Sequence, residues 1–528
     1  MFPRMVRNVF PFLIGLVTGI YFISLQVTGH GLTHYPGDLV DGRFCNYILE
    51  NAYLFFNGTQ RYFWGAPFMY PEINVISYSD NLLGTAPFYS AFRIAGCDRE
   101  AAYQYWFLLI SALNYTTAYF FLNYLFKNRY AAVLGAMVFA FSIALQSQTS
   151  HAQTFPRFAI PLAFMTGLMF MQSLRPLYFF ACLFFVVYQI YCGIYLGFML
   201  MVPIALFFLI SFFYKRKLYM EHMKSFRWWI LMGLALLINI GILWPLLKPY
   251  MARANEIGLY PYEHISKSLL TPMSYLFSGS GTVLWDFLSG LCKNYEGYCD
   301  YQVFAGIIAT LGLLIFAGIV VAKLISKNAF QKIELNVHVI MLFFTSVLTF
   351  IFFIKIGDFS FYKILYYLPG FASMRALQRI INIELIFYGI GVAFVLSLLF
   401  RNENRRTYLA FLAAVGFFVV DNYLRKDYVH HVEVAESKSR INPLIEKMKK
   451  IPAGMIVSYE PDKIGSDIND FQLDAMLAAQ TLHLKTLNGY TSTSPAGYSE
   501  YWVRPAPDSR EHWLKVKGVP SESIAVIH

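Results

Sequence analysis

The sequence predicts an α-helical polytopic membrane protein that ends in a small extracytoplasmic α/β domain. Of its 528 residues, 57% are hydrophobic and only 14% are charged, whereas a soluble domain has roughly 25% charged residues. So much apolar surface cannot be hidden from water within one chain, and it falls into successive runs of near membrane-spanning length. Near residue 430 the apolar runs stop and charged, turn-rich sequence begins, which predicts a separate domain.

The apolar runs predict about 11 transmembrane helices. The first run, 10–27, follows Arg4 and Arg7 and lacks a small-residue cleavage site. We therefore expect a retained helix rather than a signal peptide. The other predicted spans are 103–125, 130–146, 156–173, 176–190, 193–213, 226–248, 303–324, 336–354, 381–400 and 406–424.

Basic residues predict the orientation of these helices. They gather in short turns, such as the run 215–217, and the chain has a formal net charge of +11. With the N-terminus in the cytoplasm, the basic turns fall on the cytoplasmic side, as the positive-inside rule expects. An odd number of crossings then places everything after residue 425 on the outer side. The basicity is therefore explained without nucleic acid as a partner. The large loops 28–102, 249–302 and 355–380 are expected on the opposite side.

The chain is expected to divide into two domains. Residues 1–429 hold the spans and the large outer loops, and residues 430–528 form an extracytoplasmic α/β domain. Periodicity in this second part predicts helices and strands in alternation. These elements are the helices 441–450 and 470–482 and the strands 455–459 and 523–527.

The segment GDLVDGRFCNYILE, residues 37–50, directly follows the first span and carries Asp38, Asp41, Arg43 and Glu50. Gly37 and Asp38 predict a helix start, with Asp38 at or near the N-cap. Asp41, three residues later, would share its helical face. Carboxylates placed where a span meets water suit a general base. They equally suit helix capping, and the spacing leaves both interpretations open.

Other polar candidates fall on the same predicted side of the membrane. They are Asp80 in YSDN, His151 and Arg157 in HAQTFPRF, and Arg375 and Arg379 in LPGFASMRALQR. The last two are four residues apart and could clamp a phosphate or diphosphate, although interfacial arginines also extend to lipid headgroups. His151 could be a structural hydrogen-bonder, Arg157 an interface anchor, and Asp80 the residue that closes an Asx-turn.

The six cysteines show no spacing typical of a zinc site. In an oxidising compartment, Cys45 with Cys97 and Cys292 with Cys299 are candidate disulfides, and free buried thiols are the alternative. The sequence also contains no Walker A loop, no GxGxxG, no HExxH and no GxSxG. Nucleotide-binding, zinc-protease and serine-hydrolase motifs are therefore absent.

A first span followed by a large outer loop that opens with an Asp-bearing amphipathic helix resembles the GT-C superfamily of membrane glycosyltransferases. More closely, the chain resembles the YfhO-like integral membrane proteins of bacteria within that superfamily. The stretches that carry this resemblance are GDLVDGRFCNYILE at 37–50, NVISYSDNLLGTAPFY at 74–89, LPGFASMRALQR at 368–379 and TLNGYTSTSPAGY at 486–498.

The resemblance implies a GT-C-like fold in a bacterial inner membrane and a polyprenyl-phosphate-linked sugar donor. It also implies an outward-facing site in which a loop carboxylate is the base. Asp38 is then the expected base, Asp41 the near alternative, and Asp80 a second acidic or metal-linked position. The expected substrate-binding residues are Arg43, His151, Arg157, Arg375 and Arg379. The sequence itself requires no cofactor and leaves a divalent metal open.

The favoured function is an inverting glycosyltransferase whose acceptor is a glycan, a lipid or a protein. The C-terminal part lacks the WWDYG motif of oligosaccharyltransferases, which disfavours transfer to protein asparagine. The alternative is a non-enzymatic lipid-linked glycan binder, transporter or assembly factor on the same scaffold. A glycan binder or transporter would need Arg375 and Arg379 but not Asp38.

Overall fold

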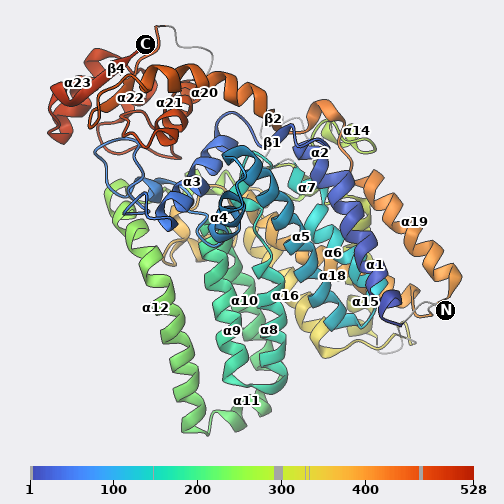
Figure 1. Ribbon diagram of the computed structural model, residues 1–528. Helices are drawn as coiled ribbons and strands as arrows, with labels where there is room; N and C mark the ends of the chain where they lie inside the picture. Colours follow the sequence, from blue (N-terminus) through green and yellow to red (C-terminus); the bar gives the residue numbers. More distant parts are fainter. Residues whose placement is uncertain are drawn as a thin grey trace.

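The computed structural model describes residues 4–146, 148–290, 301–326, 329–331, 333–402, 404–462 and 468–528. Its helices form a bundle that carries the C-terminal segment at one end (Figure 1). Two helices of the first large loop, α3 (Asp41–Phe56) and α4 (Ala86–Ile94), lie close to the junction between the bundle and that segment. The loop 28–102, which contains the candidate carboxylates, therefore contributes to this junction.

Among the described residues, six helical segments are long and apolar enough to cross a membrane. They are Val9–Thr28, formed by α1 (Arg4–Gly19), η1 (Ile20–Ser24) and α2 (Leu25–Thr28); Ala152–Ser173, which includes η3 (Ala152–Thr154) and α8 (Ala159–Ser173); α10 (Ile194–Tyr214); α12 (Phe226–Ile257); α15 (Ile307–Ile325); and Leu377–Leu399, formed by η8 (Leu377–Ile380) and α18 (Ile381–Leu399). Shorter apolar helices are α6 (Arg129–Phe141) with α7 (Ile143–Gln146), α9 (Pro176–Cys192) and α16 (Val337–Phe353). A helical membrane protein is confirmed, while the count of about 11 crossings stays a prediction.

The remaining predicted spans coincide with α5 (Arg99–Phe126) and α19 (Arg405–Asp421). Short helices occupy the turns and loops and carry no span of their own. They are η2 (Val75–Tyr78), α11 (Arg216–His222), α13 (Tyr262–Ser266), η4 (Pro272–Leu276), α14 (Asp286–Ser289), α17 (Tyr362–Tyr366), η7 (Phe371–Ser373) and η9 (Lys426–Tyr428).

Helix α12 shows how the bundle meets lipid. Its 32 residues run beside α9 at the margin of the bundle (Figure 1). Large apolar side chains along it, including Leu236, Leu237 and Trp244, are about half exposed or more. A helix that exposes so much apolar surface is stable in a bilayer and not in water, which fits the membrane assignment.

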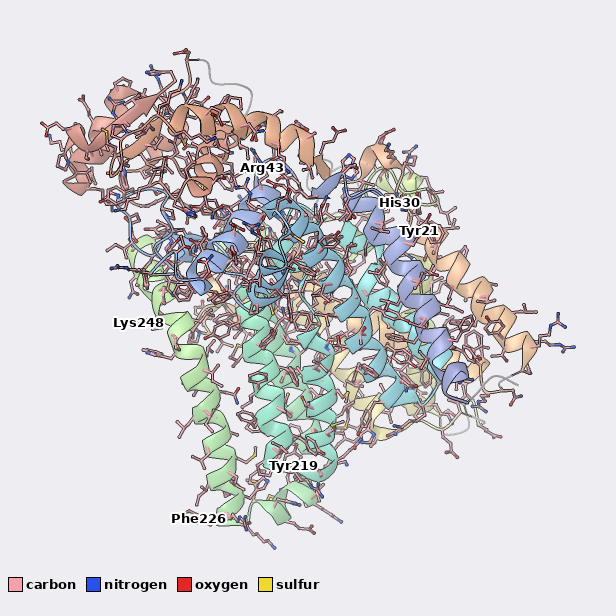
Figure 2. The ribbon with its side chains drawn as sticks, in the orientation of Figure 1. Tyr21, His30, Arg43, Tyr219, Phe226 and Lys248 are labelled. Atoms are coloured by element: carbon pink, nitrogen blue, oxygen red, sulfur yellow. The ribbon has the colours of Figure 1, made fainter. Side chains whose placement is uncertain are left out.

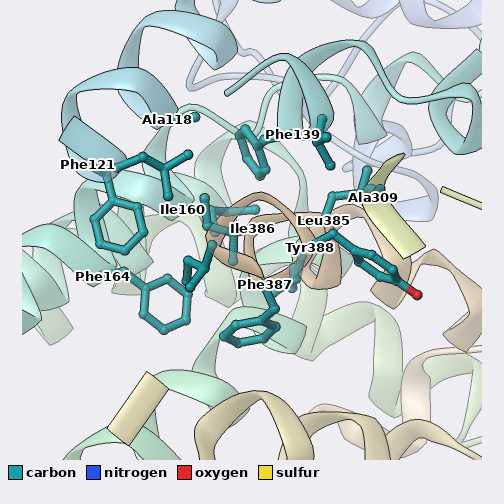
Figure 3. Close-up of a cluster of buried hydrophobic side chains, with 14 of the residues drawn as sticks. Ala118, Phe121, Phe139, Ile160, Phe164, Ala309, Leu385, Ile386, Phe387 and Tyr388 are labelled. Atoms are coloured by element: carbon teal, nitrogen blue, oxygen red, sulfur yellow. The ribbon is translucent and has the colours of Figure 1, made fainter. Parts of the chain in front are cut away.

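Helix α18 forms the centre of the bundle. It packs against α6 and α15, and Figure 3 shows its Leu385, Ile386 and Phe387 among buried side chains of neighbouring helices. The backbones of α6 and α18 approach closely at two glycines. A Cβ built on Gly389 would lie 2.7 Å from the carbonyl oxygen of Gly135. Small residues at such crossings let membrane helices pack tightly.

The first loop and the C-terminal segment are joined by backbone pairing. β1 (His34–Pro36) pairs antiparallel with β2 (His431–Glu433), with Tyr35 opposite Val432. The segment continues with α20 (Val434–Met448), β3 (Ile456–Tyr459), α21 (Ile468–Thr481), α22 (Ser499–Val503), α23 (Pro507–Lys517), η10 (Ser521–Ser523) and β4 (Ile524–Ile527), and β3 and β4 pair in parallel. The predicted helices and strands of this region therefore exist, although α20 begins earlier than expected. The division into two domains stays a prediction.

Of the two alternatives left open for Cys45 and Cys97, the free thiols are confirmed and the disulfide is wrong. The Cys45 thiol is buried and donates a hydrogen bond to the side-chain oxygen of Gln153 at 3.3 Å, so it faces the bundle. Cys97 lies just before α5 and is half-buried. The second predicted pair, Cys292 with Cys299, lies outside the described residues.

Candidate active site

Asp41 occupies the centre of the candidate site. It is the first residue of α3, and its side chain is 32% exposed. The Tyr490 hydroxyl donates a hydrogen bond to Oδ1 at 2.7 Å, and His151 Nδ1 lies 3.2 Å from Oδ2. One carboxylate is thus held from two sides, by the C-terminal segment and by the turn before α8, while solvent still reaches it.

These neighbours keep the Asp41 carboxylate ionised. Burial alone raises the pKa of Asp41. The hydrogen bond and charge of His151, the hydrogen bond from Tyr490 and the charge of Arg379 together outweigh burial and leave the pKa below its ordinary value. Burial and the nearby Asp41 charge raise the pKa of Tyr490, so that this phenol remains a hydrogen-bond donor at neutral pH.

Asp80 supplies a second carboxylate from another part of the same loop. Its Oδ1 accepts a hydrogen bond of 2.6 Å from the backbone N–H of Ile194, the first residue of α10. Burial raises the pKa of Asp80 to about 6, although the Ile194 N–H and the charge of Arg379 oppose that rise. Asp80 therefore caps a membrane helix and titrates closer to neutral pH than an ordinary aspartate.

Arg379 connects the two carboxylates electrostatically, because its charge lowers the pKa of both Asp41 and Asp80. Both carboxylates in turn contribute to the raised pKa of the buried Cys45 thiol, for which burial is the largest cause. Asp41, Asp80 and Arg379 thus share one electrostatic neighbourhood, although they come from sequence positions far apart. The structure brings these three predicted site residues together, with His151 beside them.

Asp38 lies at the surface and caps the helix. It precedes α3, whereas the sequence predicted a helix beginning at Gly37 and Asp38. The side chain is exposed, and its Oδ1 accepts backbone N–H groups from Val40 at 3.0 Å and Gly42 at 3.1 Å. Since the helix begins only at Asp41, the two carboxylates do not share a helical face. That expectation is wrong, and Asp38 is a capping residue here.

Arg375 and Arg379 lie at the entrance to α18. Arg379 belongs to η8 and is half-buried, while Arg375 is exposed and donates a hydrogen bond of 3.0 Å to the carbonyl oxygen of Ser492. The Tyr195 hydroxyl, at the start of α10, donates a hydrogen bond of 3.4 Å to the carbonyl oxygen of Ser373 in the same loop. Two guanidinium groups and a phenol therefore lie near one another at this end of the bundle.

Two other predicted substrate-binding arginines lie away from this group. Arg43 is 1% exposed and forms an ion pair with Asp474 of α21, which fastens the C-terminal segment to α3. Figure 2 labels Arg43 where the two parts of the chain meet. Arg157 is equally buried, and its Nη1 donates a hydrogen bond to the side-chain oxygen of Asn382 at 3.2 Å.

Tyr490 and the TSTS stretch that follows it, residues 491–494, are contacts of the site that were not expected from the sequence. Ser492 donates its hydroxyl hydrogen bond to the carbonyl oxygen of Tyr78 at 2.5 Å, and Arg253 of α12 donates one to the Thr493 hydroxyl. Segment 490–493 is thereby attached to the first loop, to α12 and to the entrance of α18. In the sequence, this stretch was notable only for its resemblance to YfhO-like proteins, and nothing in it indicated contacts with the site.

The described residues contain no group of three or more His, Cys, Asp and Glu side chains that could hold a metal ion. Asp41 with His151 is a pair, and Asp80 is bound to a backbone N–H. Within the described residues, this arrangement does not fit a site in which three or more such side chains bind one metal ion.

Solved structures with a similar fold include archaeal oligosaccharyltransferases, whereas no family model and no curated protein matches the sequence. One is AglB from Archaeoglobus fulgidus in complex with an inhibitory peptide and a dolichol-phosphate, with 12% identity over 98% of this chain and 69% of that chain and a TM-score of 0.51. The apo form of the Archaeoglobus fulgidus enzyme has a TM-score of 0.52 at 12% identity, over 97% and 69% of the two chains.

AglB is a member of the GT-C superfamily. The predicted GT-C-like arrangement of membrane helices is therefore confirmed at the level of the fold. At 12% identity the likeness extends no further than the fold. The YfhO-like assignment stays a prediction.

Proposed function

We propose that this protein is a membrane glycosyltransferase that transfers a sugar from a polyprenyl-phosphate-linked donor to an acceptor. The observation that carries the proposal is the arrangement around Asp41. A solvent-accessible carboxylate is held by Tyr490 and His151, and Arg379 acts on it electrostatically. A base beside a cationic group is what displacement of a phosphate leaving group requires. The GT-C-like fold of a known lipid-linked-sugar enzyme supports the same reaction class.

Asp41 is the proposed general base. Its carboxylate would accept the proton of the acceptor nucleophile as that atom attacks the anomeric carbon, and a single displacement inverts the configuration there. Its lowered pKa makes it a weak base. A weak base suffices when the transition state is oxocarbenium-like, because the acceptor loses its proton late, after it has become strongly acidic. Tyr490 and His151 hold the carboxylate in position for that transfer.

Arg379 and Arg375 are the proposed partners of the donor phosphate. The bond between the anomeric carbon and the phosphate oxygen breaks as the acceptor attacks, and negative charge accumulates on the departing phosphate. Guanidinium groups stabilise that charge directly. No protonating acid is then required. The half-buried Arg379 is the stronger candidate, because its charge acts on both Asp41 and Asp80.

The site is proposed to lie on the extracytoplasmic side of a bacterial inner membrane, with the N-terminus in the cytoplasm. The distribution of basic residues supports this orientation, and the lipid tail of the donor would lie along the apolar helices. The YfhO-like group is the proposed place of the chain within the GT-C superfamily. The acceptor is a glycan, a lipid or a protein.

The test is sugar transfer by the purified full-length protein from a set of polyprenyl-phosphate sugars. The measured quantity is the polyprenyl phosphate that is released. Asp41→Asn removes the proton acceptor and should lower turnover by about 10²–10⁴-fold, the usual contribution of a general base. Asp38→Asn is the matched control, because this exposed residue caps the same helix without contacting Tyr490 or His151.

Equal turnover of wild-type protein and Asp41→Asn would remove the proposed base. If the wild-type protein binds the donors and transfers nothing, the non-enzymatic glycan-binder function replaces the enzyme proposal. If only Asp38→Asn loses activity, then Asp38 is the general base, as first expected from the sequence.

A further inference from the structure

Arg157 is a buried positive charge with no negative partner. The side chain is 1% exposed, and it lies between η3 and α8. Its guanidinium donates to the Asn382 amide oxygen and stacks over the Phe139 ring at 5.3 Å. Nε has no hydrogen-bond partner in the part of the chain that the structure describes, and no carboxylate there pairs with the side chain.

Other arginines in buried surroundings are compensated. Arg43, which is also 1% exposed, pairs with Asp474. Arg99, at 11% side-chain exposure, pairs with Glu100 at 3.0 Å. Because arginine stays protonated in proteins and an unpaired buried charge is strongly unfavourable, Arg157 needs a counter-charge that the described chain does not supply.

A cavity of about 30 Å³ lies beside Arg157. Its walls include the apolar residues Val27, Phe107 and Phe155, together with hydroxyl-bearing side chains. One water molecule needs roughly 10–15 Å³ of such space. The cavity therefore has room for a halide ion or one or two waters, but none for a sugar or a lipid headgroup.

The hydroxyl groups in this cavity are not equivalent. Ser111, Ser142 and Thr149 already donate to backbone carbonyl oxygens at 2.9, 3.1 and 3.0 Å. The Ser24 hydroxyl makes no hydrogen bond within the described chain. It is the last residue of η1, a π-helical turn, and such turns recur at functional sites. The Ser24 hydroxyl and the Arg157 Nε–H are thus two donors left over in one cavity.

We propose that this cavity binds a small monovalent anion of halide size, held by Arg157 and Ser24. The anion neutralises the buried guanidinium and accepts the two remaining hydrogen bonds. It also stabilises the junction of η1, α2, α5, α6 and α7 with the turn before α8, whose residues form the cavity wall. This site is separate from the proposed transfer chemistry, because Arg157 contacts neither Asp41 nor Asp80.

The test compares thermal unfolding of the full-length protein in detergent with chloride, bromide or gluconate at matched ionic strength. Gluconate is too large for the cavity. Chloride and bromide should raise the unfolding midpoint above that in gluconate by roughly 2 °C or more, since a ligand of the folded state stabilises it. Arg157→Gln should abolish the difference, and Ser24→Ala should reduce it.

The matched control is Arg43→Gln, which removes an equally buried arginine that has its own carboxylate and should keep the full halide response. If Arg157→Gln does not fold, bromide anomalous scattering from wild-type crystals locates the ion, and a peak in the cavity is expected. An identical midpoint in all three salts, a halide response that persists in Arg157→Gln, or a cavity that contains only water would each overturn the proposal.

Discussion

At the scale of single residues, the account depends on how Asp41 is held. Tyr490 and His151 occupy the two oxygens of its carboxylate, so the position and the basicity of this group are set by neighbours outside its own helix. Spacing along the sequence could show that Asp38 and Asp41 were close to each other. It could not show which of them would receive these partners, because Tyr490 is separated from Asp41 by 449 positions.

Tyr490→Phe should change the pH dependence of the reaction. The Tyr490 hydrogen bond favours the ionised form of Asp41, so its loss raises the pKa of Asp41. A base acts only when deprotonated, and the acidic limb of the kcat/KM profile should therefore move to higher pH. We expect roughly tenfold lower kcat/KM in the acidic range, where Asp41 titrates, and recovery as the pH approaches neutrality.

The control for this prediction is Tyr53→Phe, which removes a hydroxyl from α3 that does not contact Asp41. Its pH profile should match that of the wild-type protein. If Tyr490→Phe lowers activity equally at every pH, then Tyr490 contributes packing alone and does not tune the carboxylate.

At the scale of elements, the crossing of α6 and α18 determines where the entrance loop with Arg379 is placed. Arg379 lies in η8, directly before α18, and α18 is fixed by its close approach to α6. The apolar runs predicted both helices well, because hydrophobicity and length are local properties of the sequence. The close approach at Gly135 and Gly389 depends on the partner helix and was not predictable from either run alone.

Gly389→Ala should weaken this crossing. The added methyl group would lie 2.7 Å from the Gly135 carbonyl oxygen, so a backbone must move. Overpacking of this kind costs about 1–3 kcal/mol, and the unfolding midpoint in detergent should fall. Gly416→Ala in α19 is the matched control, because a Cβ there meets no atom within 4 Å. Equal midpoints for the two variants would contradict the tight crossing.

At the scale of the whole molecule, the C-terminal segment completes the site. β1 pairs with β2, α21 packs on α3, and segment 490–493 reaches Asp41 and the entrance to α18. The sequence indicated this segment from its composition, and its helices and strands lie near their predicted ranges. Its contact with Asp41 was not predictable, since a contact between such distant positions depends on how the whole chain folds.

Arg43→Gln should loosen the attachment of this segment. Removing one partner of a buried ion pair costs about 3–5 kcal/mol. The lower end applies here, because Arg440 still pairs with Asp474 at 2.8 Å. Limited proteolysis should then cleave the chain after α19 faster than in wild-type protein. Lys438→Gln removes an exposed ion pair with Asp98 and should have little effect, below about 1 kcal/mol. Unchanged proteolysis of Arg43→Gln would show that other contacts hold the segment.

The most direct measurement for the proposed function is an experimental structure of the full-length protein with a polyprenyl phosphate in a lipid nanodisc. We expect the phosphate to contact Arg379 on the side that faces Asp41, with the polyprenyl tail along the apolar helices. A phosphate bound at the opposite end of the bundle, remote from Asp41 and Arg379, would show that the proposed transfer site is wrong.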